Sequence, residues 1–83
     1  MAFETLNRLK WTGALAKAEI TFVHRGAPGD VKTVSGANVT ELKRSHFHYK
    51  DNGRETHIPN HRIVEVRMEG KVLWQKRTNT RKE

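Results

Sequence analysis

Runs in which polar and apolar residues alternate are separated along this 83-residue sequence by turns built from glycine, asparagine or proline. The clearest of these runs cover residues 19–25, 46–49 and 61–68. Such alternation is the pattern of a strand with one buried face, and short turns between runs are typical of antiparallel hairpins. A chain of this length has room for one core. The sequence therefore predicts one small domain dominated by antiparallel strands.

The segments around these runs complete the predicted fold. Leu6 and Leu9 lie three residues apart ahead of Gly13, which predicts a short helix over residues 5–11 of at most two turns. Further strands are expected at residues 31–35, 55–58 and 71–75, and also at residues 39–43, where Val39 and Leu42 would alternatively suit one helical turn. We thus expect an α+β fold, a β-rich single domain over residues 1–76. In it, a short N-terminal helix packs on a curved antiparallel sheet of about five or six strands. Residues 77–83 are polar and charged, and we expect them to form a basic, disordered tail.

The last hairpin, closed by Glu69 and Gly70, carries a predicted register. A two-residue loop places the pairs Met68–Lys71, Val66–Leu73 and Val64–Gln75 on one face and the pairs Arg67–Val72 and Glu65–Trp74 on the other. We expect the first face to be buried. The second face would carry His61, Ile63, Glu65, Arg67 and Trp74, a mixture typical of a ligand-binding surface.

The charge of the chain indicates the class of its partner. Sixteen Lys and Arg against nine Asp and Glu give a net charge of +7, which predicts an anionic partner, with nucleic acid ahead of an acidic protein or a membrane surface. The absence of cysteine excludes disulfides, thiol catalysis and cysteine-based zinc sites. Because no apolar run is long enough to cross a bilayer and no leader opens the chain, we expect a soluble cytoplasmic protein with no membrane partner.

Two His-Arg dipeptides are the candidate phosphate-binding groups. His24-Arg25 precedes a glycine-rich loop at residues 26–30, and His61-Arg62 follows Pro59. The planar guanidinium of arginine matches two phosphate oxygens, and histidine can donate or exchange a proton near neutral pH. Backbone N–H groups of the loop, which contains Gly26 and Gly29, would add partial positive charge. The alternative is that these histidines only end their strands and that the arginines are solvated.

Catalysis and metal binding are weaker interpretations. His24 and His61 could act as general base and general acid of a metal-independent RNA phosphodiesterase, but no spacing among the five histidines singles out a pair. We therefore expect a binding module rather than an enzyme. His46-x-His48 and the spacing from His57 to His61 each offer two metal ligands without a matching carboxylate or cysteine set, so neither a metal nor a cofactor is expected. The Gly26-x-x-Gly29 loop lacks the Lys-Ser/Thr that follows in a P-loop.

Aromatic and basic residues extend the predicted surface. Trp74 is the candidate stacking platform for a base, and Arg67 would contact the neighbouring nucleotide. Lys43-Arg44 and the basic residues from Lys76 onward would attract a phosphate backbone without regard to sequence. A general RNA-binding module with no preference for RNA ends is therefore a second alternative.

Four segments in order carry a family resemblance. They are Leu6-Asn7-Arg8-Leu9-Lys10-Trp11, His24-Arg25-Gly26-Ala27-Pro28-Gly29-Asp30, Glu55-Thr56-His57-Ile58-Pro59-Asn60-His61-Arg62-Ile63 and Gly70-Lys71-Val72-Leu73-Trp74. Over this range the chain resembles the RNA cyclic group end recognition domain family, which consists of small, mostly archaeal RNA repair domains. The resemblance implies binding of RNA 3′ ends that carry a 2′,3′-cyclic or terminal phosphate, in RNA repair or processing, with RNA-end-processing enzymes as partners.

The resemblance also implies roles for single residues. The family's polar motif positions fall on His24, Arg25, Asp30, Thr56, His61 and Arg62. In this interpretation the two arginines hold phosphate oxygens, the two histidines bond ribose-linked oxygens, and Asp30 orients Arg25 or caps the turn. Asn60 departs from the pattern, because an aromatic residue, often Tyr, is expected before the second His-Arg pair.

Overall fold

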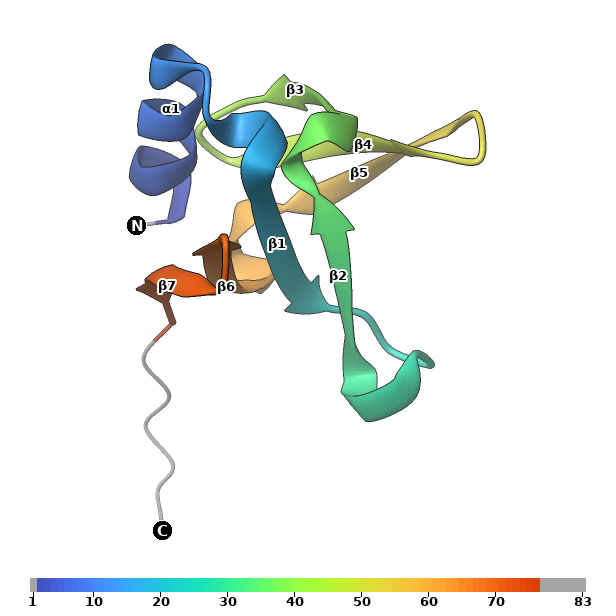
Figure 1. Ribbon diagram of the computed structural model, residues 1–83. Helices are drawn as coiled ribbons and strands as arrows, with labels where there is room; N and C mark the ends of the chain where they lie inside the picture. The colour runs from blue at the N-terminus through green and yellow to red at the C-terminus, as the bar shows by residue number, and fades with distance from the viewer. Residues whose placement is uncertain (1, 77–83) are drawn as a thin grey trace, which may run out of the picture.

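Residues 2–76 form one α-helix and seven strands that make two antiparallel sheets (Figure 1). The computed structural model describes residues 2–76, except for the side chain of Pro28. The elements are α1 (Ala2–Thr12), β1 (Ala18–Val23), β2 (Val31–Ser35), β3 (Val39–Leu42), β4 (His46–Asp51), β5 (Arg54–Pro59), β6 (Ile63–Met68) and β7 (Lys71–Gln75). Short 3₁₀ turns η1 (Leu15–Lys17), η2 (Pro28–Asp30), η3 (Gly36–Asn38) and η4 (Asn60–Arg62) connect them. The predicted basic tail lies outside the described residues.

The two sheets confirm the predicted α+β class and correct its detail. One sheet has the order β2-β1-β6-β7 and the other the order β3-β4-β5. The chain changes sheet at η3, between β2 and β3, and returns at η4, between β5 and β6. The strands therefore number seven in two sheets, instead of five or six in one curved sheet. The corner at η4 carries one of the His-Arg dipeptides.

Aromatic rings from both sheets meet in the core. Phe22 of β1 lies with its ring centroid 6.0 Å from that of Phe47 and 5.8 Å from that of Tyr49, both on β4. The alternation in residues 46–49 is confirmed, since Phe47 and Tyr49 are buried while the histidines between them face outward. Fully burying a large apolar side chain stabilises a fold by about 1.5–3 kcal/mol, so these rings hold the two sheets together.

The helix begins earlier than predicted. Ala2, Leu6 and Leu9 are the buried positions of α1 and follow the spacing of one helix face, but alanine is too weak a hydrophobic signal to extend the prediction to the N-terminus. Its end at Gly13 is confirmed. Gly13 has a φ of 78°, its N–H donates to the Lys10 carbonyl, and the Ala14 N–H donates to that of Leu9, the pair of bonds that closes a helix with glycine. The helix has 11 residues, and no helix of the described chain could span a membrane.

A β-bulge overturns part of the predicted register of the last hairpin. Glu69 and Gly70 form the expected two-residue turn, with φ of 51° and 81°. The observed pairs are Met68–Lys71, Arg67–Val72, Val66–Trp74 and Glu65–Gln75. The predicted pairs Val66–Leu73, Val64–Gln75 and Glu65–Trp74 are therefore wrong, because Leu73 is an extra residue in β7. Trp74 consequently lies on the face of Val66 and packs against the core, while Leu73 is 37% exposed.

A second irregularity corrects the faces of β6. The β1–β6 pairing runs from Thr21–Glu65 directly to Phe22–Ile63, so Val64 is the extra residue. Ile63 and Val66 are consequently both fully buried. The prediction that Ile63 shares a face with Glu65 and Arg67 is wrong, since a bulge breaks the strict period of two from which it was made.

Candidate nucleic-acid interface

The two His-Arg dipeptides lie at the same end of neighbouring strands. Phe22 of β1 pairs with Ile63 of β6 in antiparallel register. His24-Arg25 directly follows β1, and His61-Arg62 directly precedes β6, so both lie where the paired strands β1 and β6 end on the same side of the sheet. We call this side, with its two dipeptides, the dipeptide edge. All four side chains are exposed. The second dipeptide belongs to the 3₁₀ turn η4, so the predicted strand starts at Ile63 and not at His61.

The glycine-rich loop after the first dipeptide is a closed turn. Gly26, Gly29 and Asp30 have φ of 95°, 70° and 59°. The His24 N–H donates to the Asp30 carbonyl at 2.8 Å and closes the base of the loop. The N–H groups of Ala27 and Asp30 donate within the loop, to the carbonyls of His24 and Ala27. The N–H groups that this leaves in the loop for the predicted contact with a ligand are those of Gly26 and Gly29.

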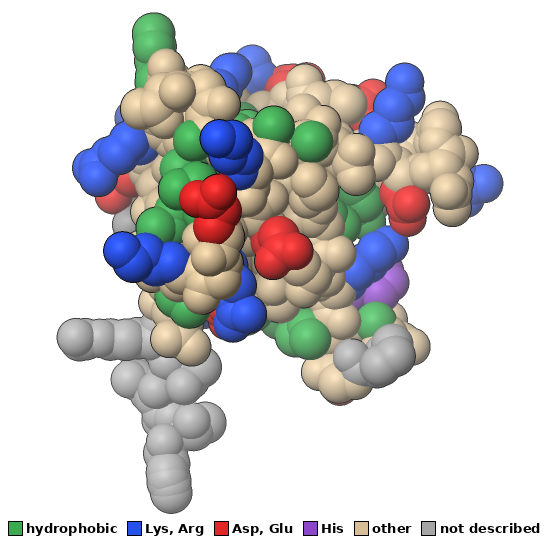
Figure 2. Space-filling view, viewed as in Figure 1, with side chains coloured by type: hydrophobic (Ala, Val, Ile, Leu, Met, Phe, Trp, Pro, Cys, Tyr) green, Lys and Arg blue, Asp and Glu red, His purple; other side chains and the backbone are tan. Residues whose placement is uncertain are grey.

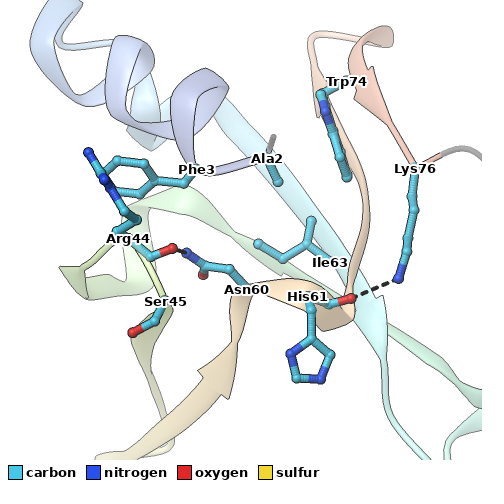
Figure 3. A pocket seen from close by; sticks show the side chains of 9 residues that line it. All are labelled: Ala2, Phe3, Arg44, Ser45, Asn60, His61, Ile63, Trp74 and Lys76. Carbon is cyan, nitrogen blue, oxygen red and sulfur yellow. Dashed lines mark hydrogen bonds between the residues drawn. The ribbon is translucent and has the colours of Figure 1, made fainter.

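A cavity of about 450 Å³ opens beside η4 (Figure 3). Its lining comes from the start of α1, the β3–β4 loop, η4, β6 and the end of β7, and consists of Ala2, Phe3, Arg44, Ser45, Asn60, His61, Ile63, Trp74 and Lys76. Apolar side chains dominate these walls, while Arg44 and Lys76 supply its cationic groups. Pockets of this size and character are typical of sites for ligands as large as a nucleoside.

Trp74 contributes to this cavity because of the bulge in β7. The Trp74 and Phe3 rings stand on opposite sides of the cavity, with Ile63 between them. The prediction that Trp74 shares a face with Glu65 and Arg67 is wrong, since Trp74 lies opposite Val66. The ring is half-buried, so one part of it packs and another part is available to a flat ligand.

Asn60 fixes one wall of the cavity. Its side-chain Nδ2 donates to the carbonyls of Lys43 and Arg44, at 2.8 and 2.9 Å, and its backbone N–H donates to the Ser45 carbonyl. These three bonds hold the β3–β4 loop against η4. Asn60 is 7% exposed, and its Oδ1 is buried without a hydrogen-bond partner within the described chain. The sequence pattern marked Asn60 only as a departure from a family and gave no sign of this role.

Lys76 fixes the opposite side of η4. Its Nζ donates to the His61 carbonyl at 2.9 Å, and its backbone N–H donates to the carbonyl of Val64 (Figure 3). The His61 carbonyl faces Lys76, while the His61 ring points away from Trp74. His61 thus connects the cavity with the edge on which the dipeptides lie.

The remaining predicted residues lie elsewhere. Thr56 is on β5, opposite Tyr49, in the three-stranded sheet. Arg67 is on β6, where its Nε lies 2.8 Å and its Nη2 2.6 Å from the Glu65 carboxylate. Neither residue lines the cavity. Of the predicted site, the structure therefore brings together the two dipeptides and their loop on one edge, and His61 and Trp74 at the cavity.

Other basic residues are dispersed over the face of the molecule seen in Figure 2. Figure 2 shows Lys and Arg side chains distributed over the visible face, with Asp and Glu between them, and no single basic patch. Lys43, predicted to attract a phosphate backbone, lies 3.5 Å from the Glu41 carboxylate, whereas its neighbour Arg44 lines the cavity. The dispersed charge provides a general attraction for anions, and the cavity provides the specific geometry.

Three histidines gather on the outer face of the three-stranded sheet. His46, His48 and His57 each offer a nitrogen within 4.8 Å of the others. Partial burial lowers the pKa of His46, and the neighbouring His57 and His48 lower it further. The sequence spacing paired His46 with His48, and His57 with His61 instead of with these two. The register of the hairpin closed by Asn52 and Gly53 would have placed His57 opposite His48.

Comparison with known proteins identifies the family. A family model described as MJ1316 RNA cyclic group end recognition domain matches residues 1–76. The chain is 40% identical over 75 residues to a UPF0248 protein of Pyrobaculum islandicum, covering 89% of this chain and 87% of that protein. It is 41% identical over 75 residues to a UPF0248 protein of Pyrobaculum calidifontis, covering 89% and 95%.

A more distant relative supports the same assignment. The chain is 35% identical over 80 residues to a UPF0248 protein of Methanococcus vannielii, covering 92% of each chain. No solved structure matches the sequence. The match over almost the whole described chain confirms the resemblance carried by the four segments, and the protein belongs to the MJ1316 RNA cyclic group end recognition domain family.

Proposed function

We propose that this protein binds the 3′ end of RNA and recognises a 2′,3′-cyclic or terminal phosphate there. The observation that carries the proposal is that one short turn, η4, contributes both to the apolar cavity and to the edge where the two His-Arg dipeptides lie. A nucleotide has the same two parts, a flat base and an anionic phosphate. The description of the family supports the same class of ligand.

In the proposed complex the phosphate lies at the dipeptide edge. Arg25 and Arg62 bind its oxygens in the bidentate manner of a guanidinium, and the N–H groups of Gly26 and Gly29 add partial positive charge. His24 and His61 bond the ribose-linked oxygens. All these side chains are exposed, so a ligand reaches them without rearrangement of the core.

The last base of the RNA occupies the cavity. Its ring stacks on Trp74, since aromatic side chains bind unpaired bases in this way irrespective of sequence. Asn60 shapes the wall beside the base by holding the β3–β4 loop against η4. Arg44 and Lys76, on the cavity wall, attract the adjoining backbone.

The biological setting that we infer is RNA repair or processing in the cytoplasm. A domain of this size can deliver an RNA end to enzymes that process it, and such enzymes are the expected protein partners. Thr56 and Arg67 lie away from the cavity, so in this proposal they have no contact with the terminal nucleotide.

The deciding experiment compares three forms of one RNA oligonucleotide, which end in a hydroxyl, a 2′,3′-cyclic phosphate or an open 3′-phosphate. Fluorescence anisotropy should give tighter binding to one or both phosphate forms than to the hydroxyl form. Arg62→Gln should abolish most of this preference. Arg54→Gln is the matched control, because Arg54 is an exposed arginine at the β4–β5 turn, outside the proposed site. Equal binding of all three ends would contradict the proposal and leave a general RNA-binding module.

The same samples test the catalytic alternative. His24 and His61 lie at the same end of one strand pair, and general acid and base catalysis would need both imidazoles within reach of one phosphodiester. Chromatography of the cyclic-phosphate oligonucleotide after incubation should show no conversion if the protein only binds. Conversion that is lost in His24→Ala would instead identify a phosphodiesterase.

A further inference from the structure

The outer face of the three-stranded sheet carries a histidine cluster that the RNA-binding proposal does not use. His46 and His48 alternate along β4 with Phe47 and Tyr49, so burial of the two aromatic rings turns both imidazoles outward. His57 on β5 is the direct cross-strand partner of His48. The ring centroids of His46 and His57 are 4.4 Å apart in a stacked arrangement.

The nitrogens of this cluster have the spacing of metal ligands. Nε2 of His48 lies 3.1 Å from Nδ1 of His57, and all three histidines offer a nitrogen within 4.8 Å of the others. Two nitrogens that each lie about 2.0–2.1 Å from a tetrahedral zinc ion are about 3.3 Å from one another. One pair therefore already has this separation. The nitrogen of His46 lies within 4.8 Å of the others, and its ring, now stacked on that of His57, would turn to bring the nitrogen to the ion.

In His48 and His46, neighbouring groups bind one ring nitrogen and leave the other available to a metal ion. The Nδ1 of His48 faces two carboxylates, Glu55 at 3.4 Å and Glu41 at 3.7 Å. A carboxylate that accepts the other ring N–H is the usual outer partner of a metal-bound histidine, because it fixes the tautomer and strengthens the ligand. The Nδ1 of His46 lies 3.0 Å from the Ser45 hydroxyl, which leaves its Nε2 as the ligand.

Charge and accessibility agree with this arrangement. His46 and His48 are half-buried and His57 is exposed, so an ion can enter from solvent. Glu41 and Glu55 would offset the charge of a bound divalent cation. Lys43, directly after β3, and Lys50 on β4 also lie near the cluster, and their positive charges oppose cation binding. A set of three histidines leaves a coordination position for water or for an anionic oxygen.

We propose that His46, His48 and His57 form a binding site for one divalent transition-metal ion of the zinc class, with Glu41 and Glu55 as outer carboxylates. Imidazole ligands suit Zn²⁺, Ni²⁺ and Cu²⁺ and disfavour Mg²⁺ and Ca²⁺. The site is separate from the cavity lining except through Ser45, which lines the cavity and contacts His46. It is independent of the proposed RNA binding.

Calorimetric titration of the untagged full-length chain with Zn²⁺ tests this site. One ion should bind per chain, and Co²⁺ should give the visible absorption of a four- or five-coordinate complex. His48→Gln and His57→Gln should each weaken Zn²⁺ binding by more than about 100-fold, and the double change Glu41→Gln and Glu55→Gln by about 10- to 100-fold. His24→Gln is the matched control, because it removes a histidine outside the cluster and should leave the affinity unchanged.

Circular dichroism of each variant verifies that the fold is retained, which is expected because the three imidazoles face away from the core. The absence of saturable Zn²⁺ binding by the wild-type chain would overturn the proposal. So would Zn²⁺ binding that His57→Gln and His48→Gln leave unchanged, or that His24→Gln weakens as strongly as they do.

Discussion

At the scale of single residues, the Asn60 side chain holds together two segments of the cavity wall that lie far apart in the sequence. It joins η4 to the β3–β4 loop through three hydrogen bonds, two of them from its Nδ2. Among the described residues, Asn60 is the buried polar side chain. Its Nδ2 donates to two backbone carbonyls that would lose these donors without it. The position of Arg44 at the cavity depends on these bonds.

Asn60→Ala should therefore destabilise the protein by about 1–3 kcal/mol, the usual cost of leaving buried hydrogen-bonding groups without partners. Urea unfolding followed by circular dichroism measures this change. Asn38→Ala is the control, since Asn38 is an exposed asparagine in η3 and should alter stability little. Equal unfolding free energies for the Asn60 variant and the wild type would contradict the role assigned to Asn60.

Glu55 is a second residue whose behaviour follows from one contact. The Thr40 hydroxyl donates to its carboxylate at 2.6 Å, and this bond lowers the pKa of Glu55, with a further contribution from His48. A lowered pKa means that the folded chain holds the charged form more strongly than the unfolded chain does. The resulting stabilisation is present above the ordinary glutamate pKa and is lost as the pH falls through the lowered value.

Thr40→Val removes this hydroxyl donor while keeping a branched side chain. The pKa of Glu55 should then rise toward its ordinary value, which carbon-detected NMR titration of the carboxyl group can follow. Thr33→Val is a suitable comparison, because Thr33 bonds Thr21 on another sheet and should leave the Glu55 titration unchanged. A pKa that does not move in Thr40→Val would show that the hydroxyl is not the cause.

At the scale of elements, two bulges decide which side chains reach the cavity. The extra residue Leu73 places Trp74 opposite Val66, and the extra residue Val64 places Ile63 in the core. Each bulge inverts the faces that strict alternation predicts for the residues beyond it. The places of Trp74 and Ile63 in the cavity lining therefore depend on the departure of both strands from regular pairing.

The two tryptophans test this arrangement directly. Trp11 on α1 is 82% exposed, while Trp74 lines the cavity. In a Trp11→Phe variant, addition of RNA should quench the remaining Trp74 fluorescence, whereas in Trp74→Phe it should leave Trp11 fluorescence largely unchanged. Trp74→Ala should weaken RNA binding by about 1–3 kcal/mol, or about 5- to 140-fold. Quenching of Trp11 alone would place the RNA elsewhere.

At the scale of the whole molecule, local patterns predicted the elements and missed how they assemble. Turns with positive φ, such as Asn52-Gly53 and Glu69-Gly70, are visible in the sequence, and the hairpins they close are present. The change of sheet at η4 and the bulges depend on packing between distant segments, so alternation alone cannot reveal them. The same holds for the predicted site. The two His-Arg dipeptides are visible in the sequence, but their proximity follows from the pairing of β1 with β6, which is a contact between distant segments.

The dispersed positive charge gives a prediction for the molecule as a whole. The chain carries a net charge of +7, so RNA affinity should fall as salt rises, for every RNA end. For single strands, each phosphate contact contributes about −0.7 to the slope of log affinity against log salt. Arg25→Gln should therefore make the slope shallower by about 0.7, whereas Arg54→Gln, outside the proposed site, should not. An unchanged slope in Arg25→Gln would remove Arg25 from the phosphate contacts.

Within residues 2–76, the turn η4 is also the only covalent return from the three-stranded sheet to the four-stranded one. Asn60 and Lys76 anchor it from opposite sides. A ligand held by this turn and by the neighbouring strand end would act as a brace across the seam between the sheets. Occupancy of the site would thereby be felt as stiffness throughout the domain, and slower hydrogen exchange of amides on both sides of the seam would be its signature.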